Sequence, residues 1–372
     1  MSCQSQFPKF FSFLSSRSLS PFSLDKPPQV RHIPTMRILI IGGTGLISGP
    51  TTKGLLTRGD QVVHFNRGWQ ATPPPEVQTI TGDRRNTEEF ETRFADEYFD
   101  AVIDMVCYNA GDAESDVRAF SGRTRHFIFC STVCVYGDRV PHSVFIDEDH
   151  PRIPISKYAR GKLEAEQVFQ DAFARGALPA TVMRPTRVYG PTAELRHNTG
   201  AADSTWDRLE HGLPILCSGD GLAMFQLCHC DEVATAFVHA LCREKTIGEA
   251  YNVTPQDVIT WREFYGVAAA SMGQVAHLLY APASWIIAQD PHRFLELRTI
   301  FKHHGVYSTD KIRRDVPEFG HWIPLQDGLA ATLQGMKARN EWPRWQDDLQ
   351  LSRILETVGS WGVEPEIADF RQ

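Results

Sequence analysis

The sequence predicts an α/β fold, a doubly wound parallel sheet followed by a smaller mixed C-terminal lobe. Three observations lead to this prediction. Short apolar runs alternate with amphipathic helical stretches from Arg37 to about Gly190. The first apolar run ends in a glycine-rich turn that opens a helix. Beyond Gly190 the alternation weakens and short strands mix with helices, as expected of a lobe laid across the carboxyl ends of the sheet.

The individual elements follow one another in a regular order. The first strand, 38–41, is a continuous apolar run, which is typical of a strand buried on both faces. Further strands of the sheet are expected at 61–65, 77–80, 101–106, 126–130 and 181–183. Helices are expected between them at 46–57, 87–95, 112–120 and 157–174. In the second half, the pattern favours a strand at 223–227 and a helix at 231–243.

The composition narrows the classes of partner. Apolar residues make up 42% of the 372-residue chain, which is enough for a sizeable core. The formal net charge of −7 gives no electrostatic reason to expect nucleic acid as a partner. No apolar run is long enough to cross a bilayer, so no membrane partner is expected. The 8 cysteines lack the spacing of a zinc site and are interpreted as free thiols of a reducing compartment, with no metal.

The turn after the first strand points to a phosphate-bearing ligand. Gly42, Gly43 and Gly45 stand where backbone must approach a pyrophosphate closely and where a helix N-terminus offers N–H donors. Together with Thr44, Leu46 and Ile47, they are the candidate residues of a Rossmann-type dinucleotide site. The third glycine of the usual fingerprint is replaced by Ser48.

The end of the second strand distinguishes NAD from NADP. An acid there would bind the ribose hydroxyls of NAD, but this chain has Asn66 and Arg67. Asn does not repel a 2′-phosphate and Arg can bind one, so NADP is favoured over NAD. Asp83, after the third strand, is placed either to meet an adenine amino group or to cap the next helix.

These expectations divide the chain into four segments. Residues 1–35 are rich in Ser and Phe with a single acid, Asp25, and form either a disordered extension or a targeting segment. Residues 36–190 are expected to be mainly the dinucleotide-binding domain and residues 191–338 mainly the substrate lobe. Residues 339–372 are a tail expected to be helical. The expected location is the cytoplasm, with organelle targeting by residues 1–35 left open.

A candidate acid–base pair lies on the long helix 157–174. Tyr158 and Lys162 are four residues apart and therefore share a helix face. A tyrosine is normally too weak an acid for neutral pH, but a nearby ammonium lowers the pKa of a phenol. Ser131 and Thr132 follow a strand at the same sheet edge, where either hydroxyl could bind a substrate oxygen. Turn and cap roles remain alternatives for these hydroxyls.

The ordered set of motifs resembles the extended short-chain dehydrogenase/reductase superfamily, in particular its NAD-dependent epimerase/dehydratase family. The matching stretches run from about Met36 to about Gly335. They are IGGTGLIS (41–48), TGDRRN (81–86), STVCVYG (131–137), YARGK (158–162), RPTRVYGP (184–191), HCDEVATAF (229–237), EAYNVT (249–254) and YSTDK (307–311). The resemblance implies a catalytic hydroxyl at Thr132, an acid/base at Tyr158, and a ribose-binding role for Lys162. It also places Pro185 near the nicotinamide and makes a homodimer possible.

The chain departs from the family pattern at two positions. Arg187 stands where sugar-nucleotide epimerases commonly have an Asn that helps to hold the substrate diphosphate. Val106, after the fourth strand, stands where the family usually has a small residue, and it is expected to reshape the cofactor channel. Both departures weaken the expectation of a nucleotide-sugar substrate. His229, in the stretch resembling the family's HVDD motif, is interpreted as structural.

The leading hypothesis is a redox or epimerisation step at a secondary alcohol or ketone of a small molecule, such as a sugar or a secondary metabolite. Tyr158 would move the proton, Lys162 would supply positive charge, and Thr132 would steady the substrate oxygen. A 4,6-dehydratase needs an acid and a base at Val133 and Cys134, and neither is a carboxylate. A non-enzymatic dinucleotide sensor or RNA-binding relative on the same fold remains the alternative from another class.

Overall fold

The computed structural model describes residues 35–68, 72–137, 145–200, 203–320, 323–362 and 364–369. Residues 35–372 form one compact unit. The extension predicted for residues 1–35 lies outside the described residues, apart from Thr35. Among the described residues, no helix combines the length and the apolar composition that crossing a membrane requires.

The centre of the first lobe is a seven-stranded sheet in the order β11-β6-β5-β4-β1-β2-β3, with every neighbouring pair parallel. The strands are β1 (Arg37–Ile41), β2 (Gln61–Asn66), β3 (Gln78–Thr81), β4 (Ala101–Asp104), β5 (Phe127–Cys130), β6 (Ala180–Pro185) and β11 (Ala250–Val253). The order reverses between β1 and β4, and ligands of doubly wound sheets bind at such a switch point. This confirms the predicted fold class.

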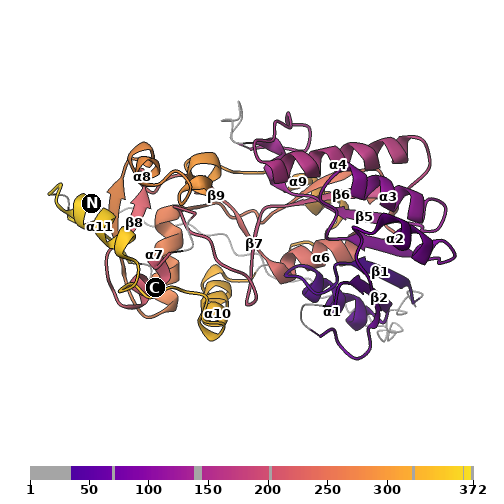
Figure 1. The fold of residues 1–372 in the computed structure, drawn as a ribbon, viewed down its shortest axis with the longest axis horizontal. Helices are drawn as coiled ribbons and strands as arrows, with labels where there is room; N and C mark the ends of the chain where they lie inside the picture. The colour runs from indigo at the N-terminus through magenta and orange to yellow at the C-terminus, as the bar shows by residue number, and fades with distance from the viewer. Residues whose placement is uncertain are drawn as a thin grey trace, which may run out of the picture. The chain divides into compact units, whose positions relative to one another are not determined.

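Two apolar cores lie on the two faces of the sheet because successive side chains of each strand point to opposite sides. Ile38 and Ile40 pack with residues of α1 (Ser48–Arg58) and α6 (Cys230–Ala240). Leu39 and Ile41 pack on the other face, with residues of α2 (Thr87–Phe94), α3 (Ala110–Phe120) and α4 (Lys157–Ala174). Figure 1 shows these two groups of helices on opposite sides of the sheet.

The second lobe has its own core and a three-stranded sheet in the order β14-β13-β8. Its strands are β8 (Ile215–Ser218), β13 (Ala276–Ala281) and β14 (Glu366–Ala368). Its helices are α5 (Thr205–Glu210), α7 (Trp261–Ser271), α8 (Ala283–Gln289), η3 (Leu297–Phe301), α10 (Leu325–Ala338) and α11 (Leu349–Gly359). Residues of α11 pack into this core, and β14 pairs with β13, so the C-terminal segment completes the lobe.

The chain passes more than once between the two lobes. After β7 (Arg187–Tyr189) it enters the second lobe, and it returns through β10 (Leu227–His229) and α6. β11 then adds the edge strand beside β6. After η3 the chain returns again to form α9 (Asp310–Asp315), whose Ile312 packs in the core under the sheet. The remaining short elements are η1 (Val133–Tyr136), β9 (Met224–Phe225), η2 (Glu244–Thr246) and β12 (Ile259–Thr260).

Candidate functional site

A cavity of about 520 Å³ opens at the switch point of the sheet. Its volume falls in the range of small-molecule and cofactor sites. Of the residues predicted to bind a dinucleotide, nine line it: Gly42, Thr44, Gly45, Leu46, Ile47, Asn66, Arg67, Asp83 and Val106. Gly43 and Pro185 are not among the lining residues. The cavity also contacts several residues that sequence reasoning missed, among them Arg85, Met105, Tyr108 and Asn109.

The glycine turn is shaped by close packing beneath it. Gly42 has φ +84°, and an added Cβ would lie 2.5 Å from the nearest methyl of Val106. A Cβ on Gly43 would lie 2.3 Å from the buried His64 ring, so Gly43 serves the packing under the turn rather than the cavity wall. Neither position tolerates a side chain without displacement of its neighbour. Val106, the bulkier residue noted in the sequence, therefore packs directly against the first glycine.

Ser48 replaces the third glycine and closes the turn with its hydroxyl. The backbone N–H of Gly45 donates to Ser48 Oγ at 2.6 Å. The helix α1 begins at Ser48, its preceding residue Ile47 supplies no side-chain cap, and its first turn has no acidic residue. The Gly49 N–H already donates to the Gly45 carbonyl oxygen, and Pro50 has no N–H, so it is the positive end of the helix dipole that suits an anion such as a pyrophosphate.

At the end of β2, the side-chain NH₂ group of Asn66 is buried without a hydrogen-bond acceptor among the described residues. Asn66 Oδ1 accepts a hydrogen bond from the Gly68 N–H at 2.9 Å, which assigns the other terminal atom as the NH₂ group. That Nδ2 is buried and has no hydrogen-bond partner among the described residues. A buried donor without an acceptor is costly. Because Asn66 lines the cavity, a ribose or phosphate oxygen fits this position.

The adjacent acid, Asp83, is already neutralised by a neighbour. Arg85 donates through Nε to both carboxylate oxygens and through Nη2 to Oδ2, and this hydrogen bonding lowers the pKa of Asp83 to about 2. The backbone N–H of Arg85 also donates to Asp83 Oδ1 at 3.0 Å. The next helix instead begins after Asn86, so Asp83 is not its cap. Arg67 and Arg85 both line this end of the cavity, which gives it a positive character.

Lys162 is held deep beside the sheet edge. Its side chain is only 2% exposed, and Nζ donates to the backbone carbonyl of Cys130 at 2.7 Å. The ammonium lies 4.9 Å from the ring centroids of Tyr108 and Phe129 and 5.9 Å from that of Tyr158. The close approach of the helix to the loop after β4 requires Gly161, where a Cβ would lie 2.2 Å from the Tyr108 carbonyl oxygen.

Tyr158 stands at the same edge and is 47% exposed. Partial burial of its hydroxyl raises the pKa of Tyr158, and the neighbouring Cys130, Cys134 and Tyr108 act in the same direction. A hydrogen bond with the Thr132 side chain opposes this shift. The sequence predicted that Lys162 would lower this pKa, but the net shift is upward and burial is its largest cause. The hydroxyls of Tyr158 and Thr132 are nevertheless brought together, as predicted.

Ser131 has a different role from its neighbour Thr132. Its hydroxyl donates to the buried Glu166 carboxylate at 2.6 Å, and Arg184 binds the same carboxylate through Nε and Nη2 at 2.9 and 2.7 Å. Arg152 adds a contact at 3.0 Å. Ser131 therefore faces an internal ion cluster, and the expectation that it can bind a substrate oxygen is wrong. Glu166 lies four residues after Lys162, and this helical spacing could have indicated the cluster.

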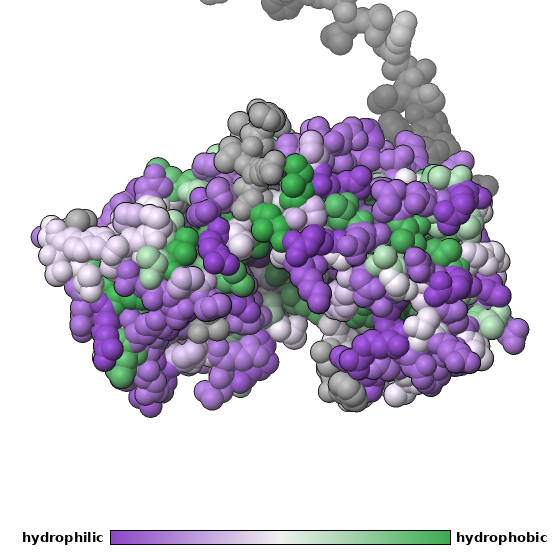
Figure 2. Space-filling view, turned by 45° about the horizontal axis from the view of Figure 1, so that its top comes forward, coloured by the Kyte–Doolittle hydropathy of each residue, from purple (hydrophilic) through white to green (hydrophobic). Residues whose placement is uncertain are grey.

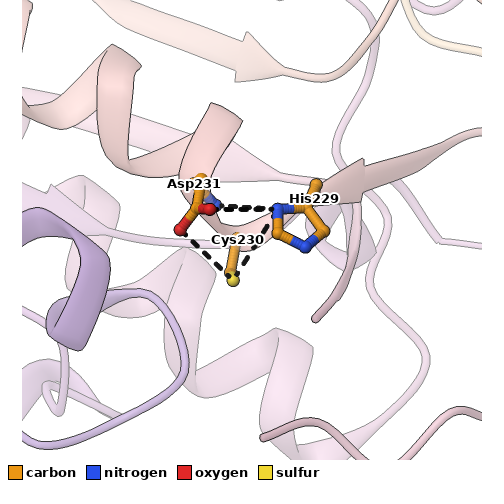
Figure 3. Close-up of side chains that lie close together, drawn as sticks. All are labelled: His229, Cys230 and Asp231. Atoms are coloured by element: carbon orange, nitrogen blue, oxygen red, sulfur yellow. Dashed lines mark hydrogen bonds and ion pairs between the residues drawn. The ribbon is translucent and has the colours of Figure 1, made fainter. Parts of the chain in front are cut away.

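His229, Cys230 and Asp231 bring three possible metal ligands together at the start of α6 (Figure 3). The Nδ1 atom of His229 accepts the backbone N–H of Asp231 at 3.3 Å, and Glu232 completes a capping box by accepting the His229 N–H. The lone pair of His229 Nδ1 therefore accepts a hydrogen bond from the first turn of α6. These contacts give His229 a structural role, in agreement with its interpretation from the sequence.

The comparisons with known proteins agree with this architecture. Residues 117–254 match the NAD dependent epimerase/dehydratase family. A 2′-dehydrokanamycin reductase of Streptomyces kanamyceticus is 29% identical over 259 residues, which cover 68% of this chain and 72% of the relative. The matched segment, residues 117–254, and this relative make the chain similar to the NAD dependent epimerase/dehydratase family. Other relatives that it matches are named as a UDP-glucose 4-epimerase and a dTDP-D-glucose 4,6-dehydratase.

Two further relatives show how widely the fold is used. The Arabidopsis thaliana chloroplast stem-loop binding protein of 41 kDa b is 30% identical over 250 residues, covering 63% of this chain and 62% of the relative. A UDP-glucuronic acid 4-epimerase from Bacillus cereus, solved in complex with NAD, superposes with a TM-score of 0.65 at 20% identity. That match covers 83% of this chain and 99% of the epimerase, and it supports the fold.

Proposed function

We propose that the protein is a nicotinamide-dinucleotide-dependent oxidoreductase or epimerase that acts on a secondary alcohol or ketone of a small molecule. The observation on which this proposal depends is the position of Tyr158 and Thr132. Their hydroxyls interact with each other, and Tyr158 shares its neighbours Tyr108 and Cys130 with the wall of the switch-point cavity. The cavity can hold the dinucleotide, while the exposed side of Tyr158 is open to a substrate.

The nicotinamide, when bound, would supply the hydride acceptor or donor. As a phenolate, Tyr158 would take a proton from a substrate alcohol at its Oη atom, and as a neutral phenol it would give that proton to a substrate carbonyl. Thr132 would hold the same substrate oxygen by a hydrogen bond. Lys162, anchored on the Cys130 carbonyl at 2.7 Å, is placed to keep positive charge behind the Tyr158 ring and to donate to a ribose hydroxyl. Holding the two reactants in contact would supply much of the remaining rate.

NADP is the favoured form of the cofactor. Arg67 and Arg85 line the cavity beside Asn66, and the carboxylate of Asp83 is engaged by Arg85 rather than directed at a ribose. A 2′-phosphate would therefore meet two guanidinium groups and an unpaired amide donor.

A cofactor-dependent turnover assay tests the proposal. The purified chain is supplied with NADPH or NADH and a panel of small ketones, including keto sugars, and the absorbance of the reduced nicotinamide is followed. The expected result is oxidation of the dinucleotide with at least one ketone, absent in Tyr158→Phe. Dinucleotide binding without turnover of any ketone in the panel would favour a sensor over an enzyme.

An RNA-binding role is the second candidate, because one relative is named a stem-loop binding protein. The net charge of −7 opposes it. Retention on heparin at various salt concentrations distinguishes the two functions, since phosphate-backbone binding weakens steeply as salt rises. Elution at low salt supports the enzyme, and strong salt-dependent retention supports the RNA-binding role.

A further inference from the structure

Tyr108 is a half-exposed aromatic residue at the edge of the switch-point cavity. It follows β4, lines the cavity and is 50% exposed. It packs in none of the four apolar cores that the described residues form. Burial of apolar surface in a core therefore does not account for an aromatic side chain at this position.

The backbone of Tyr108 is held from both sides. Its N–H donates to Asp112 Oδ2 at 2.8 Å, and a Cβ on Gly161 would lie 2.2 Å from its carbonyl oxygen. Asn109, the next residue, caps α3 by accepting the Asp112 N–H at 3.0 Å. The side chain of Tyr108 therefore starts from a fixed point directly beside the turn of α4 that carries Lys162.

The ring of Tyr108 covers the Lys162 ammonium. Nζ lies over this ring at 4.9 Å from its centroid, and over the Phe129 ring at the same distance. Both distances are within the range in which an aromatic face attracts a cation. Among the described residues, the hydrogen-bond acceptor of the ammonium is the Cys130 carbonyl. Phe129 is fully buried in the core, whereas Tyr108 is half-exposed, so Tyr108 forms the outer wall around the ammonium.

The same ring separates the ammonium from the cavity. Among the described residues, Tyr108 and Cys130 line the cavity but Lys162 does not, and Lys162 is almost fully buried. The Tyr108 ring also contacts the Tyr158 ring, with the two centroids 6.4 Å apart. One aromatic side chain thus contacts the ammonium, the cavity and the proposed acid/base residue.

We propose that Tyr108 is a positioning residue for Lys162, because the face of its ring covers the ammonium and holds it at the Cys130 carbonyl. This role requires the ring and not the phenol hydroxyl, since the face of the ring attracts the cation. The inference rests on the proposed function where it concerns turnover. An ammonium kept out of bulk water acts more strongly on Tyr158 and on a ribose hydroxyl than a solvated ammonium does.

Reductive methylation of the cofactor-free full chain with formaldehyde and a borane reductant, followed by peptide mass spectrometry, measures access to the Lys162 amine. Lys162 is expected to react at least about tenfold faster in Tyr108→Leu than in the wild type, and at the wild-type rate in Tyr108→Phe, which keeps the ring. Tyr98→Leu, which removes a tyrosine of similar exposure outside the cavity, is the control. Lys157, exposed at the start of α4, is the internal reference in every sample.

Two results of the methylation experiment would overturn the inference. One is an equal Lys162 rate in the wild type and Tyr108→Leu, and the other is a rate in Tyr108→Phe as fast as that in Tyr108→Leu. Should circular dichroism show that Tyr108→Leu does not fold, Tyr108→Gln, whose polar side chain suits an exposed position, takes its place with the same expected result.

Steady-state kinetics with a ketone that the wild type reduces tests the consequence for the reaction. Tyr108→Leu is expected to lower kcat at least about fivefold with little change in KM for the ketone, and Tyr108→Phe is expected to retain the wild-type kcat. An unchanged kcat in Tyr108→Leu despite faster methylation would overturn the positioning role. If the wild type reduces no ketone, the proposed function fails, while the methylation rates still decide whether Tyr108 covers Lys162.

Discussion

The ammonium of Lys162 donates a 2.7 Å hydrogen bond to the backbone carbonyl of Cys130, the last residue of β5. This contact fixes a nearly fully buried charge at the carboxyl edge of the sheet, between the cavity wall and the Tyr158 ring. A buried charge is costly unless it is well paired, and here the described partner is a single neutral carbonyl with aromatic rings around it. Such a position is more readily explained by function than by stability.

Lys162→Met is therefore expected to abolish turnover with little effect on stability. Removing the buried charge is favourable, whereas leaving the Cys130 carbonyl unpaired is unfavourable, so the free energy of unfolding changes by no more than about 1–2 kcal/mol. Turnover should fall by at least about a hundredfold. Urea denaturation and steady-state kinetics measure the two effects. Lys157→Met, at the exposed first position of α4, is the control and should retain activity. A large loss of stability in Lys162→Met without a selective loss of activity would contradict the functional role assigned to Lys162.

The pKa of Tyr158 is expected to depend on the cofactor. Without a cofactor, burial raises it above the ordinary value of 10.0, so the group is a neutral phenol and phenolate forms only at higher pH. Binding of oxidised NADP adds positive charge beside the ring and should lower this pKa. The difference in near-ultraviolet phenolate absorbance between the wild type and Tyr158→Phe, followed against pH, isolates this titration. A Tyr158 phenolate at neutral pH in the cofactor-free protein would show that the assigned electrostatics are wrong.

Ser48→Ala is expected to loosen the glycine turn. The substitution removes the acceptor of the 2.6 Å hydrogen bond from the Gly45 N–H and should cost about 1 kcal/mol of stability. Because the same turn is proposed to hold the pyrophosphate, the dissociation constant of NADPH should rise several-fold. Thermal unfolding and fluorescence titration measure both effects. The control is Thr57→Ala, which removes an exposed hydroxyl in the last turn of α1. Equal changes in stability and in NADPH affinity in the two variants would show that the Ser48 hydrogen bond has no special role.

His64 is expected to make stability depend on pH. Burial lowers the pKa of His64 from 6.5 to about 4, so the unfolded chain binds a proton more tightly than the folded protein does. The contribution to stability is present above pH 6.5 and is lost as the pH falls towards 4, by about 3 kcal/mol in total. His64→Gln should show a correspondingly smaller loss over this range in urea denaturation. His126, also buried with a pKa lowered to about 3, titrates in both proteins and cancels in the comparison.

Arg67→Gln is expected to weaken the binding of NADPH more than that of NADH, by about tenfold or more. The reason is loss of a guanidinium at the cavity wall next to Asn66, where a 2′-phosphate would lie. Arg93→Gln, on the exposed surface of α2, is the control because it lies outside the cavity. Equal affinity of the wild type for the two dinucleotides would contradict the preference for NADP.

Much of the first lobe was predictable because local pattern determines it. The helix at 157–174 and the strand starting at Gln61 match the structure, since their apolar spacing and flanking residues act locally. The strand expected at 223–227 was wrong in detail, because the structure divides this stretch into β9 and β10, which pair with different strands. The edge strand β11 was missed because its place beside β6 depends on a contact between distant segments.

The site was predictable to a similar degree. The spacing of the glycines identified the turn, because this backbone geometry requires residues without a side chain. Two side-chain contacts were not predictable: the hydrogen bond from Ser131 to Glu166 and the ion pair between Arg85 and Asp83. Both depend on the directions in which side chains point, and a sequence motif does not specify these directions. The second lobe was the least predictable part, because its core joins residues that are far apart in sequence. Figure 2 shows hydrophobic side chains at the hollow in the middle of one face, with further hydrophobic patches on both sides of it.

The central claim is that a nicotinamide dinucleotide binds in the cavity at the switch point. A fluorescence titration of NADPH against the wild type, Leu46→Glu and Thr57→Glu tests it most directly, because each variant adds one negative charge and only Leu46 lines the cavity. The account predicts saturable binding to the wild type and Thr57→Glu, and loss of binding in Leu46→Glu through repulsion of the pyrophosphate. No saturation of the wild type up to about 1 mM, or equal binding by all three proteins, would contradict it.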